Sequence, residues 1–227
     1  MKTQFQNQLD ETFNKHEFPL TSEQIGQLTI YRTELKRWNS HINLTALHDD
    51  SEVIYKHFLD SISVLEHYSI SANQRVIDIG TGAGFPGIVI KIYNPSIHLT
   101  LVEACQKKTA FLRYLIAQLK LDASIQVIAK RAEICAETDE LINTYDWVLT
   151  RYVASLDKSA SYCLPLLNAT GKWIAYKSTE YITEISHTKK VLHELGAKIE
   201  NVHTSRIAIL NRSYVVVSRI NTCSNML

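Results

Sequence analysis

The sequence predicts an α/β fold whose mostly parallel, seven-stranded sheet follows a short helical region at the N-terminus. Three observations predict it: five short apolar runs alternate with helical patterns, a glycine-rich loop follows the first run, and two further runs close the chain. Strands that alternate with helices of this length form right-handed βαβ units and therefore a parallel sheet. At 227 residues the chain can bury one full core and carry one small appended region.

The beginning of the chain is expected to be helical. Thr21 and Gln24 have the spacing of a capping box. Apolar residues then recur every three or four positions from Ile25 to Trp38, which is typical of an amphipathic helix. We therefore expect an N-terminal helical region over residues 1–72 and an α/β domain over residues 73–227.

The α/β domain is expected to contain seven strands in a Rossmann-like order. They are residues 75–79, 99–103, 125–128, 146–150, 172–177, 197–202 and 214–219. The helices expected between the strands are residues 107–121, 155–167 and 179–195. No long helix separates the last two strands, which predicts a hairpin-like end to the sheet.

The composition excludes several classes of protein. The net charge is only +1, so the overall charge does not indicate a nucleic-acid partner. No stretch approaches the roughly 20 apolar residues that span a bilayer, and the N-terminus lacks the apolar segment of a secretory signal. Cys105, Cys135, Cys163 and Cys223 are far apart and form no CxxC pair, which argues against a disulfide framework or a zinc site. We expect a cytoplasmic protein without a metal, and nothing in the sequence demands more than a monomer.

The loop after the first strand indicates which cofactor the domain binds. Glycines at 82, 84 and 87 match the dinucleotide fingerprint GxGxxG. Asp78 argues against that interpretation, because a carboxylate at the strand end is unfavourable beside a pyrophosphate. It is favourable beside the ammonium and sulfonium of S-adenosyl-L-methionine. The DxGxGxG pattern, in which Gly80, Gly82 and Gly84 follow Asp78, therefore predicts an S-adenosylmethionine-dependent methyltransferase of the Rossmann-like class I fold.

Two further acidic positions support the same cofactor. Glu103 ends the second strand, where a carboxylate can accept hydrogen bonds from both ribose hydroxyls. NAD enzymes place an acid similarly, so Glu103 alone does not discriminate. Ala132 and Glu133 follow the third strand, where the adenine ring would lie. The alternative for Glu103 and Glu133 is a solvated charge beside a helix.

Several stretches of the sequence resemble one bacterial family. They are Trp38–Thr45 (WNSHINLT), Lys56–Ile62 (KHFLDSI), Gly80–Gly87 (GTGAGFPG), Arg131–Glu133 (RAE) and Thr150–Leu156 (TRYVASL). In this order they resemble the RsmG family, also called glucose-inhibited division protein B, of 16S ribosomal RNA guanine-N7 methyltransferases. The similarity runs from about residue 25 to residue 177.

The resemblance implies methyl transfer to N7 of one guanine in a loop near the decoding site of the small ribosomal subunit. It also implies cofactor contacts at Gly80, Phe85, Ala132, Glu133 and Arg151. Two segments depart from the family pattern. Thr150-Arg151-Tyr152 stands where Ser/Ala-Arg-Ala is frequent, and Lys177-Ser178 stands where Lys-Gly is common.

The residues are compatible with this chemistry. Guanine N7 has a lone pair and no proton, so alignment can suffice without a general base. The fourth strand is not followed by the (Asp/Asn)-Pro-Pro-(Tyr/Phe) loop used on exocyclic amines, and no Pro-Cys nucleophile is present. Arg151, just past this strand, is the candidate catalytic and base-contacting residue; its alternative role is a salt bridge at a strand end.

Other residues are weaker candidates. Lys107, Lys108, Lys177 and Arg113 could hold the RNA backbone, although each alone is more simply a solvated charge. His57 and Asn43 could cover the cofactor, but a packed histidine is the simpler interpretation, and Trp38 is most simply a core residue.

Other functions are compatible with parts of the pattern. One is a methyltransferase of the same fold that acts on a small molecule or a protein. Another is a regulatory protein that binds the cofactor without turnover, which the intact glycine loop and Glu103 disfavour. A nucleotide-dependent oxidoreductase is disfavoured by Asp78.

Overall fold

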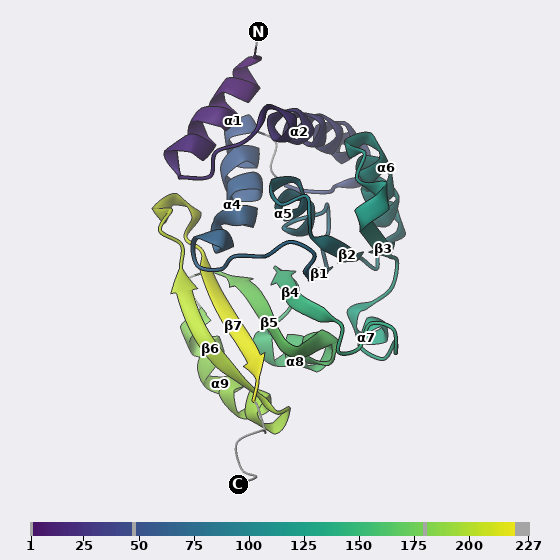
Figure 1. Ribbon diagram of the computed structural model, residues 1–227, viewed down its shortest axis with the longest axis vertical. Helices are drawn as coiled ribbons and strands as arrows, with labels where there is room; N and C mark the ends of the chain where they lie inside the picture. The colour runs from purple at the N-terminus through teal and green to yellow at the C-terminus, as the bar shows by residue number, and fades with distance from the viewer. Residues whose placement is uncertain (1, 47–48, 179–180, 221–227) are drawn as a thin grey trace.

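The computed structural model describes residues 2–46, 49–178 and 181–220 (Figure 1). In this part of the chain the sheet has seven strands in the order β3-β2-β1-β4-β5-β7-β6. The strands are β1 (Arg75–Ile79), β2 (His98–Val102), β3 (Ile125–Ile128), β4 (Tyr145–Arg151), β5 (Leu167–Lys177), β6 (Ala197–Thr204) and β7 (Ser213–Arg219). Strands β1 to β5 are parallel, and β7 is antiparallel to both β5 and β6. The predicted mostly parallel, seven-stranded sheet with a hairpin-like end is confirmed.

The helices also follow the predicted order. The longer ones are α1 (Gln4–Lys15), α2 (Ser22–Ile42), α5 (Gly87–Tyr93), α6 (Gln106–Leu119), α8 (Leu156–Cys163) and α9 (Tyr181–Glu194). Short segments are α3 (Asp50–Glu52), the π-helical η1 (Val53–Leu59), α4 (Asp60–Ile62), η2 (Ser63–Glu66), η3 (Asp122–Ser124), α7 (Ala132–Cys135), η4 (Leu164–Leu166) and η5 (Ala208–Leu210). The helix expected over residues 155–167 ends at Cys163. Pro165 lies in the short segment η4 that follows, since proline has no N–H for a continuing helix.

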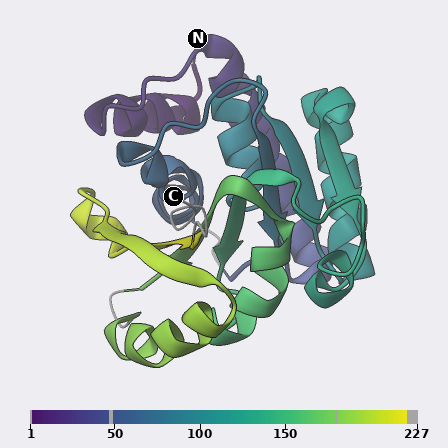
Figure 2. The ribbon, with the colours of Figure 1, turned by 60° about the horizontal axis from the view of Figure 1, so that its bottom comes forward.

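The sheet is buried on both faces because successive side chains of each strand point to opposite sides. On one side Leu149 of β4 and Ile174 of β5 pack with α1, α2, α5, α6 and the segment from η1 to η2. On the other side Val148 and Trp173, their neighbours in sequence, pack with α8 and α9. Figures 1 and 2 show these two layers of helices with the sheet between them. The N-terminal helices therefore share one buried cluster with the first layer.

The predicted capping box fixes how α2 meets the α/β domain. The Thr21 hydroxyl accepts from the Gln24 amide (3.2 Å), and the Gln24 side-chain oxygen accepts from the Thr21 amide (2.8 Å). The Gln24 side-chain NH₂ then donates to the carbonyls of Ile92 and Tyr93, at 3.1 and 3.0 Å. One side chain therefore caps α2 and attaches it to the last turn of α5.

Three expectations from the sequence concern membrane spans, metal ligands and cysteines. Within residues 2–46, 49–178 and 181–220, no helix is long and apolar enough to cross a membrane. The same residues contain no group of three or more potential metal ligands. Cys105, Cys135 and Cys163 are free thiols, and Cys223 lies outside the described residues.

Candidate active site

A cavity of about 500 Å³ lies at the carboxyl ends of β1, β2 and β4. Strand β1 has β2 on one side and β4 on the other, so the strand order reverses here. Open α/β sheets bind ligands outside the carboxyl ends of their strands at such a reversal. The lining residues are Ile79, Gly80, Val102, Glu103, Ala104, Lys130, Arg131, Ala132, Glu133, Val153, Ala154, Lys158, Ser161 and Tyr162. Four predicted cofactor residues are among them: Gly80, Glu103, Ala132 and Glu133.

The glycine loop bends beside this cavity with three residues at positive φ. Gly80, Gly82 and Gly84 have φ of +68°, +62° and +102°, a region in which side chains other than glycine are strained. At Gly80 a Cβ would also lie 2.8 Å from a methyl carbon of Val153. The loop glycines therefore serve both the turn and the close approach of the segment after β4.

Asp78 is fully buried beneath the loop and is not among the cavity-lining residues. Its Oδ2 accepts from the Thr81 hydroxyl (2.6 Å) and from the Gly87 amide at the start of α5 (2.8 Å). Its Oδ1 is buried without a hydrogen-bond partner among the described residues. Burial raises the pKa of Asp78 to about 6, against the opposing effects of these hydrogen bonds and of Arg151. In the structure Asp78 therefore organises the loop and keeps one oxygen unpaired.

Glu103 connects the glycine loop to the start of α6. Its Oε2 accepts from the Gly82 amide (3.0 Å) and its Oε1 from the Cys105 amide (2.8 Å). Only 9% of the residue is exposed, yet it lines the cavity. Because each carboxylate oxygen has more than one lone pair, both oxygens can also accept from a ligand hydroxyl.

The remaining walls of the cavity come from α7 and α8. Ala132 and Glu133 form the first turn of α7, while Lys130 just before α7 and Lys158 of α8 add exposed positive charges. Buried Tyr162 lines the same cavity. Sequence reasoning missed Lys130, Lys158 and Tyr162, because only the folded sheet brings α7 and α8 to one side of the loop.

Arg151, the candidate catalytic residue, ends β4 and is nearly buried. Its Nη1 donates to Asp60 Oδ2 (2.8 Å), and its guanidinium carbon lies 5.2 Å from the centre of the Phe85 ring. Arg212 also binds Asp60, with Nε 2.7 Å from Oδ1 and Nη2 3.1 Å from Oδ2. Arg151 therefore makes a salt bridge at a strand end, inside a buried cluster of two arginines and one aspartate.

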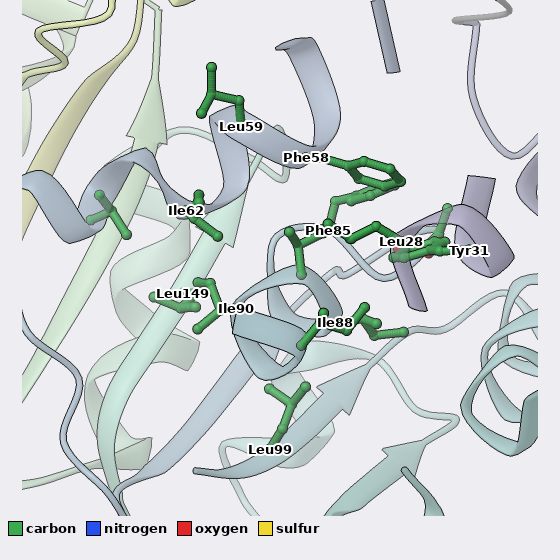
Figure 3. Close-up of a cluster of buried hydrophobic side chains, with 14 of the residues drawn as sticks. Leu28, Tyr31, Phe58, Leu59, Ile62, Phe85, Ile88, Ile90, Leu99 and Leu149 are labelled. Carbon is green, nitrogen blue, oxygen red and sulfur yellow. The ribbon is translucent and has the colours of Figure 1, made fainter. Parts of the chain in front are cut away.

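Phe85 lies in a stack of three rings outside the cavity lining. Its ring is 4.4 Å from the His57 ring and 5.0 Å from the Tyr31 ring, with interplanar angles of 5° and 4°. Figure 3 shows Phe85 among Tyr31, Phe58 and the buried residues of α5. Burial, with a smaller effect of Arg151, lowers the pKa of His57 to about 3, so the imidazole is neutral at pH 7. His57 is therefore a packed histidine, held by the Phe85 stack and by Thr45 Oγ1 at 2.8 Å.

The three lysines predicted to bind RNA lie on two elements, Lys107 and Lys108 on α6 and Lys177 on β5. Lys107 is exposed and Lys108 half-buried on the first turn of α6. Lys177 at the end of β5 donates to the Ala154 carbonyl (3.0 Å) and to Glu184 Oε1 (2.8 Å). Lys177 therefore anchors the segment after β4 to α9.

Two other N-terminal candidates have structural roles. Asn43 is the left-handed residue that ends α2, with φ of +33°. Trp38 is half-buried and packs edge-on against Phe111 of α6, with ring centres 5.6 Å apart. Trp38 thus joins α2 to α6, as expected of a core residue.

Comparison with known sequences identifies the family. The model described as GidB, rRNA small subunit methyltransferase G, matches residues 24–213. A ribosomal RNA small subunit methyltransferase G of Desulforamulus reducens is 38% identical over 214 residues, which cover 93% of this chain and 89% of that protein. Another, of Acetivibrio thermocellus, is 39% identical over 204 residues, covering 88% of this chain and 82% of that protein.

Comparison with solved structures identifies the same fold. A SAM-dependent methyltransferase from Aquifex aeolicus has a TM-score of 0.59 at 15% identity, over 78% of this chain and 97% of that chain. TYW2 of M. jannaschii, solved in complex with AdoMet, has a TM-score of 0.51 at 22% identity, over 66% and 72%. These likenesses confirm the predicted Rossmann-like methyltransferase fold. The family match covers most of the chain and extends past residue 177, so the chain belongs to the rRNA small subunit methyltransferase G family and is a methyltransferase.

Proposed function

We propose that the protein transfers the methyl group of S-adenosyl-L-methionine to N7 of one guanine in the 16S ribosomal RNA of the small subunit. The observation that carries the proposal is the cavity at the strand-order reversal, built from the glycine loop and Glu103 in a chain whose family match covers residues 24–213. The relatives named above are ribosomal RNA small subunit methyltransferases, which favours the same class of substrate here.

The residues of the cavity fit this cofactor. Its volume of about 500 Å³ falls within the roughly 300–1,000 Å³ usual for small-molecule sites. Glu103 would accept hydrogen bonds from the ribose hydroxyls, and the first turn of α7 with Ala132 and Glu133 would bind the adenine. Asp78 Oδ1, which is buried without a hydrogen-bond partner among the described residues, would provide negative charge beside the loop for a cationic ligand. The bound cofactor supplies an electrophilic methyl group.

The chain need not supply a general base for this reaction. Guanine N7 carries a lone pair and no proton, so the protein has to align the base and exclude water. His57 is neutral, its Nε2 is hydrogen-bonded to Thr45, and its ring stacks on Phe85, which fits a positioning role. Arg151 is held by Asp60 two residues before Val153 of the cavity wall, and we assign the target base as its contact.

Positive side chains around the cavity provide contacts for the RNA backbone. Three helices, α6, α7 and α8, begin at the carboxyl edge of the sheet and carry positive side chains at or just before their first turns. These side chains are Lys107 and Lys108 of α6, Lys130 and Arg131 before α7, and Lys158 of α8. Phosphate contacts of this kind position an RNA without reading its sequence. The net charge of +1 sums the whole chain and therefore does not reveal this local group of positive side chains.

The proposal extends to where and in what form the protein acts. Ribosomal RNA as the substrate implies action in the cytoplasm. We also propose that the active form is a monomer.

The test is methyl transfer from tritiated S-adenosylmethionine to a panel of acceptors. Small subunits and naked 16S RNA from a strain that lacks the modification are compared with large subunits, peptides and metabolites. We expect label only in the first two acceptors. Label in a metabolite or peptide would support the small-molecule or protein alternative, whereas cofactor binding without transfer to any acceptor would support a regulatory protein.

A further inference from the structure

Tyr152 is an aromatic residue in an unusual position directly after Arg151. Its side chain lies largely in solvent, with 77% of the residue exposed. Its φ is +57°, a left-handed conformation that is strained for a bulky side chain. Strained backbone conformations cluster at functional sites, where the surrounding structure enforces them.

The surrounding structure holds the Tyr152 ring firmly. Arg212 Nη2 donates to the Tyr152 hydroxyl (2.6 Å), and the Arg212 guanidinium carbon lies 4.9 Å from the ring centre. Arg212 is itself fixed by its two hydrogen bonds to Asp60. The ring is therefore held at its hydroxyl end by an anchored cation, while its high exposure leaves the aromatic surface largely in solvent.

The segment that carries the ring borders the candidate active site. Arg151 precedes Tyr152, while Val153 and Ala154 follow it and line the cavity. Lys177 donates to the Ala154 carbonyl, which fixes the segment at its other end. Both ends of the segment that carries the ring are therefore anchored.

We propose that Tyr152 is the platform on which the target base stacks. The inference rests on the proposed function, since it needs an RNA base at this cavity. A flat, solvent-exposed aromatic face with a fixed orientation suits a purine taken out of its own stack, because every base presents a π-face. Tyr152 holds the plane of the base, and Arg151 contacts its edge.

Substitutions at Tyr152 separate stacking from bulk and from the hydroxyl contact. Tyr152→Ala removes the ring, Tyr152→Leu keeps an apolar side chain without a π-face, and Tyr152→Phe removes only the hydroxyl. Tyr114→Ala is the matched control. Tyr114 on α6 also accepts from an arginine, Arg37 Nη1 at 3.2 Å, and has the Arg37 guanidinium 5.9 Å from its ring centre.

The measurement is kcat/KM for small subunits together with the cofactor dissociation constant from calorimetry. We expect Tyr152→Ala and Tyr152→Leu to lower kcat/KM by about 5- to 150-fold, the range that corresponds to one base–aromatic stack. Cofactor affinity and thermal unfolding should stay as in the wild type, and Tyr114→Ala should stay near wild-type activity. Tyr152→Phe keeps the π-face but loses the Arg212 contact, so it should retain more activity than Tyr152→Leu.

Three results would overturn the inference: an unchanged kcat/KM in Tyr152→Ala, a Tyr152→Leu variant as active as Tyr152→Phe, or an equal loss of cofactor affinity. Failure of the proposed function is distinguishable, because the wild-type protein itself would then not methylate small subunits.

Discussion

Arg151 at the end of β4 donates from Nη1 to Asp60 Oδ2 over 2.8 Å, and both side chains are almost completely buried. This contact joins the candidate active site to the N-terminal helical segment. Arg212, just before β7, binds the same carboxylate from the other side. Three parts of the chain that are distant in sequence therefore meet at one charge cluster beside the candidate active site.

Arg151→Ala should reduce methyl transfer more than it reduces cofactor affinity. The substitution leaves Asp60 paired with Arg212, so no carboxylate is left without a partner. The cavity lining does not include Arg151, which is why the cofactor should still bind. Single-turnover rates and calorimetry measure the two effects. Equal losses would assign Arg151 to the cofactor instead of the target base.

Cofactor affinity should depend on the ionisation of Asp78. Burial raises the pKa of this group to about 6, and a cationic ligand favours the carboxylate. As the pH falls below 6, Asp78 takes up a proton, and affinity should decrease by up to about tenfold per pH unit. The Asn side chain of Asp78→Asn can still accept hydrogen bonds from Thr81 and Gly87, so the loop conformation should be retained. This variant should bind the cofactor more weakly at pH 7, with an affinity that does not change with pH. Isothermal titration from pH 5 to 7.5 tests this, and a pH-dependent Asn variant would disprove the role of Asp78.

His57 should make the protein sensitive to acid. In the native state its pKa is lowered to about 3, whereas the ordinary value of 6.5 applies in the unfolded chain. Between these values the unfolded state binds more protons, so stability is lost as the pH falls from 6.5 towards 3, by up to about 1.4 kcal/mol per pH unit. His57→Gln should reduce this slope in urea unfolding. Asp78 contributes to the pH dependence of stability with the opposite sign. Its raised pKa gives a contribution that is present below pH 4 and is lost as the pH rises through 6. An identical slope in wild type and His57→Gln would contradict the account.

Gly80→Ala should weaken cofactor binding through Val153. The new Cβ would lie 2.8 Å from a Val153 methyl carbon and would push this cavity-lining side chain away. Gly82→Ala reports the effect of backbone strain without the Val153 contact, since its φ of +62° causes comparable strain and no atom of the described residues beyond its chain neighbours lies within 4 Å of the new Cβ. Both should lose about 1–2 kcal/mol of stability from the left-handed backbone.

A second substitution separates the steric effect from backbone strain. Val153→Ala should restore cofactor affinity to Gly80→Ala, with no effect in the Gly82→Ala background. Calorimetry of the two double variants measures this. Absence of rescue would show that Gly80 acts through its backbone alone.

Much of the fold could be predicted because its signals are local. Strand periodicity, the glycine loop and the capping box at Thr21 are readable within a few residues, and the structure confirms each. The position of Glu103 at the cavity could also be predicted, because this residue ends the second expected strand. The division at residue 72 stays a prediction, although the N-terminal helices and the sheet share one buried cluster.

The charge cluster at Asp60 could not be predicted in this way. Its contacts join residues 91 and 152 positions apart, and no local pattern encodes them. Asp60 lies in the KHFLDSI segment that supported the family resemblance, which was the only available signal. Asp78 was expected to face the ligand, and the structure places it beneath the loop because its Oδ2 binds Thr81 and Gly87.

The most direct test of the central claim is the identity of the methylated nucleoside. Small subunits from a strain without the modification are labelled by the protein, their 16S RNA is digested, and the tritiated nucleoside is identified by chromatography. The account predicts a single product, N7-methylguanosine, at one position that chain cleavage at N7-methylated guanine would map. Label on an exocyclic amine, a ribose or several guanines would contradict it, because the candidate active site would then need chemistry other than base alignment.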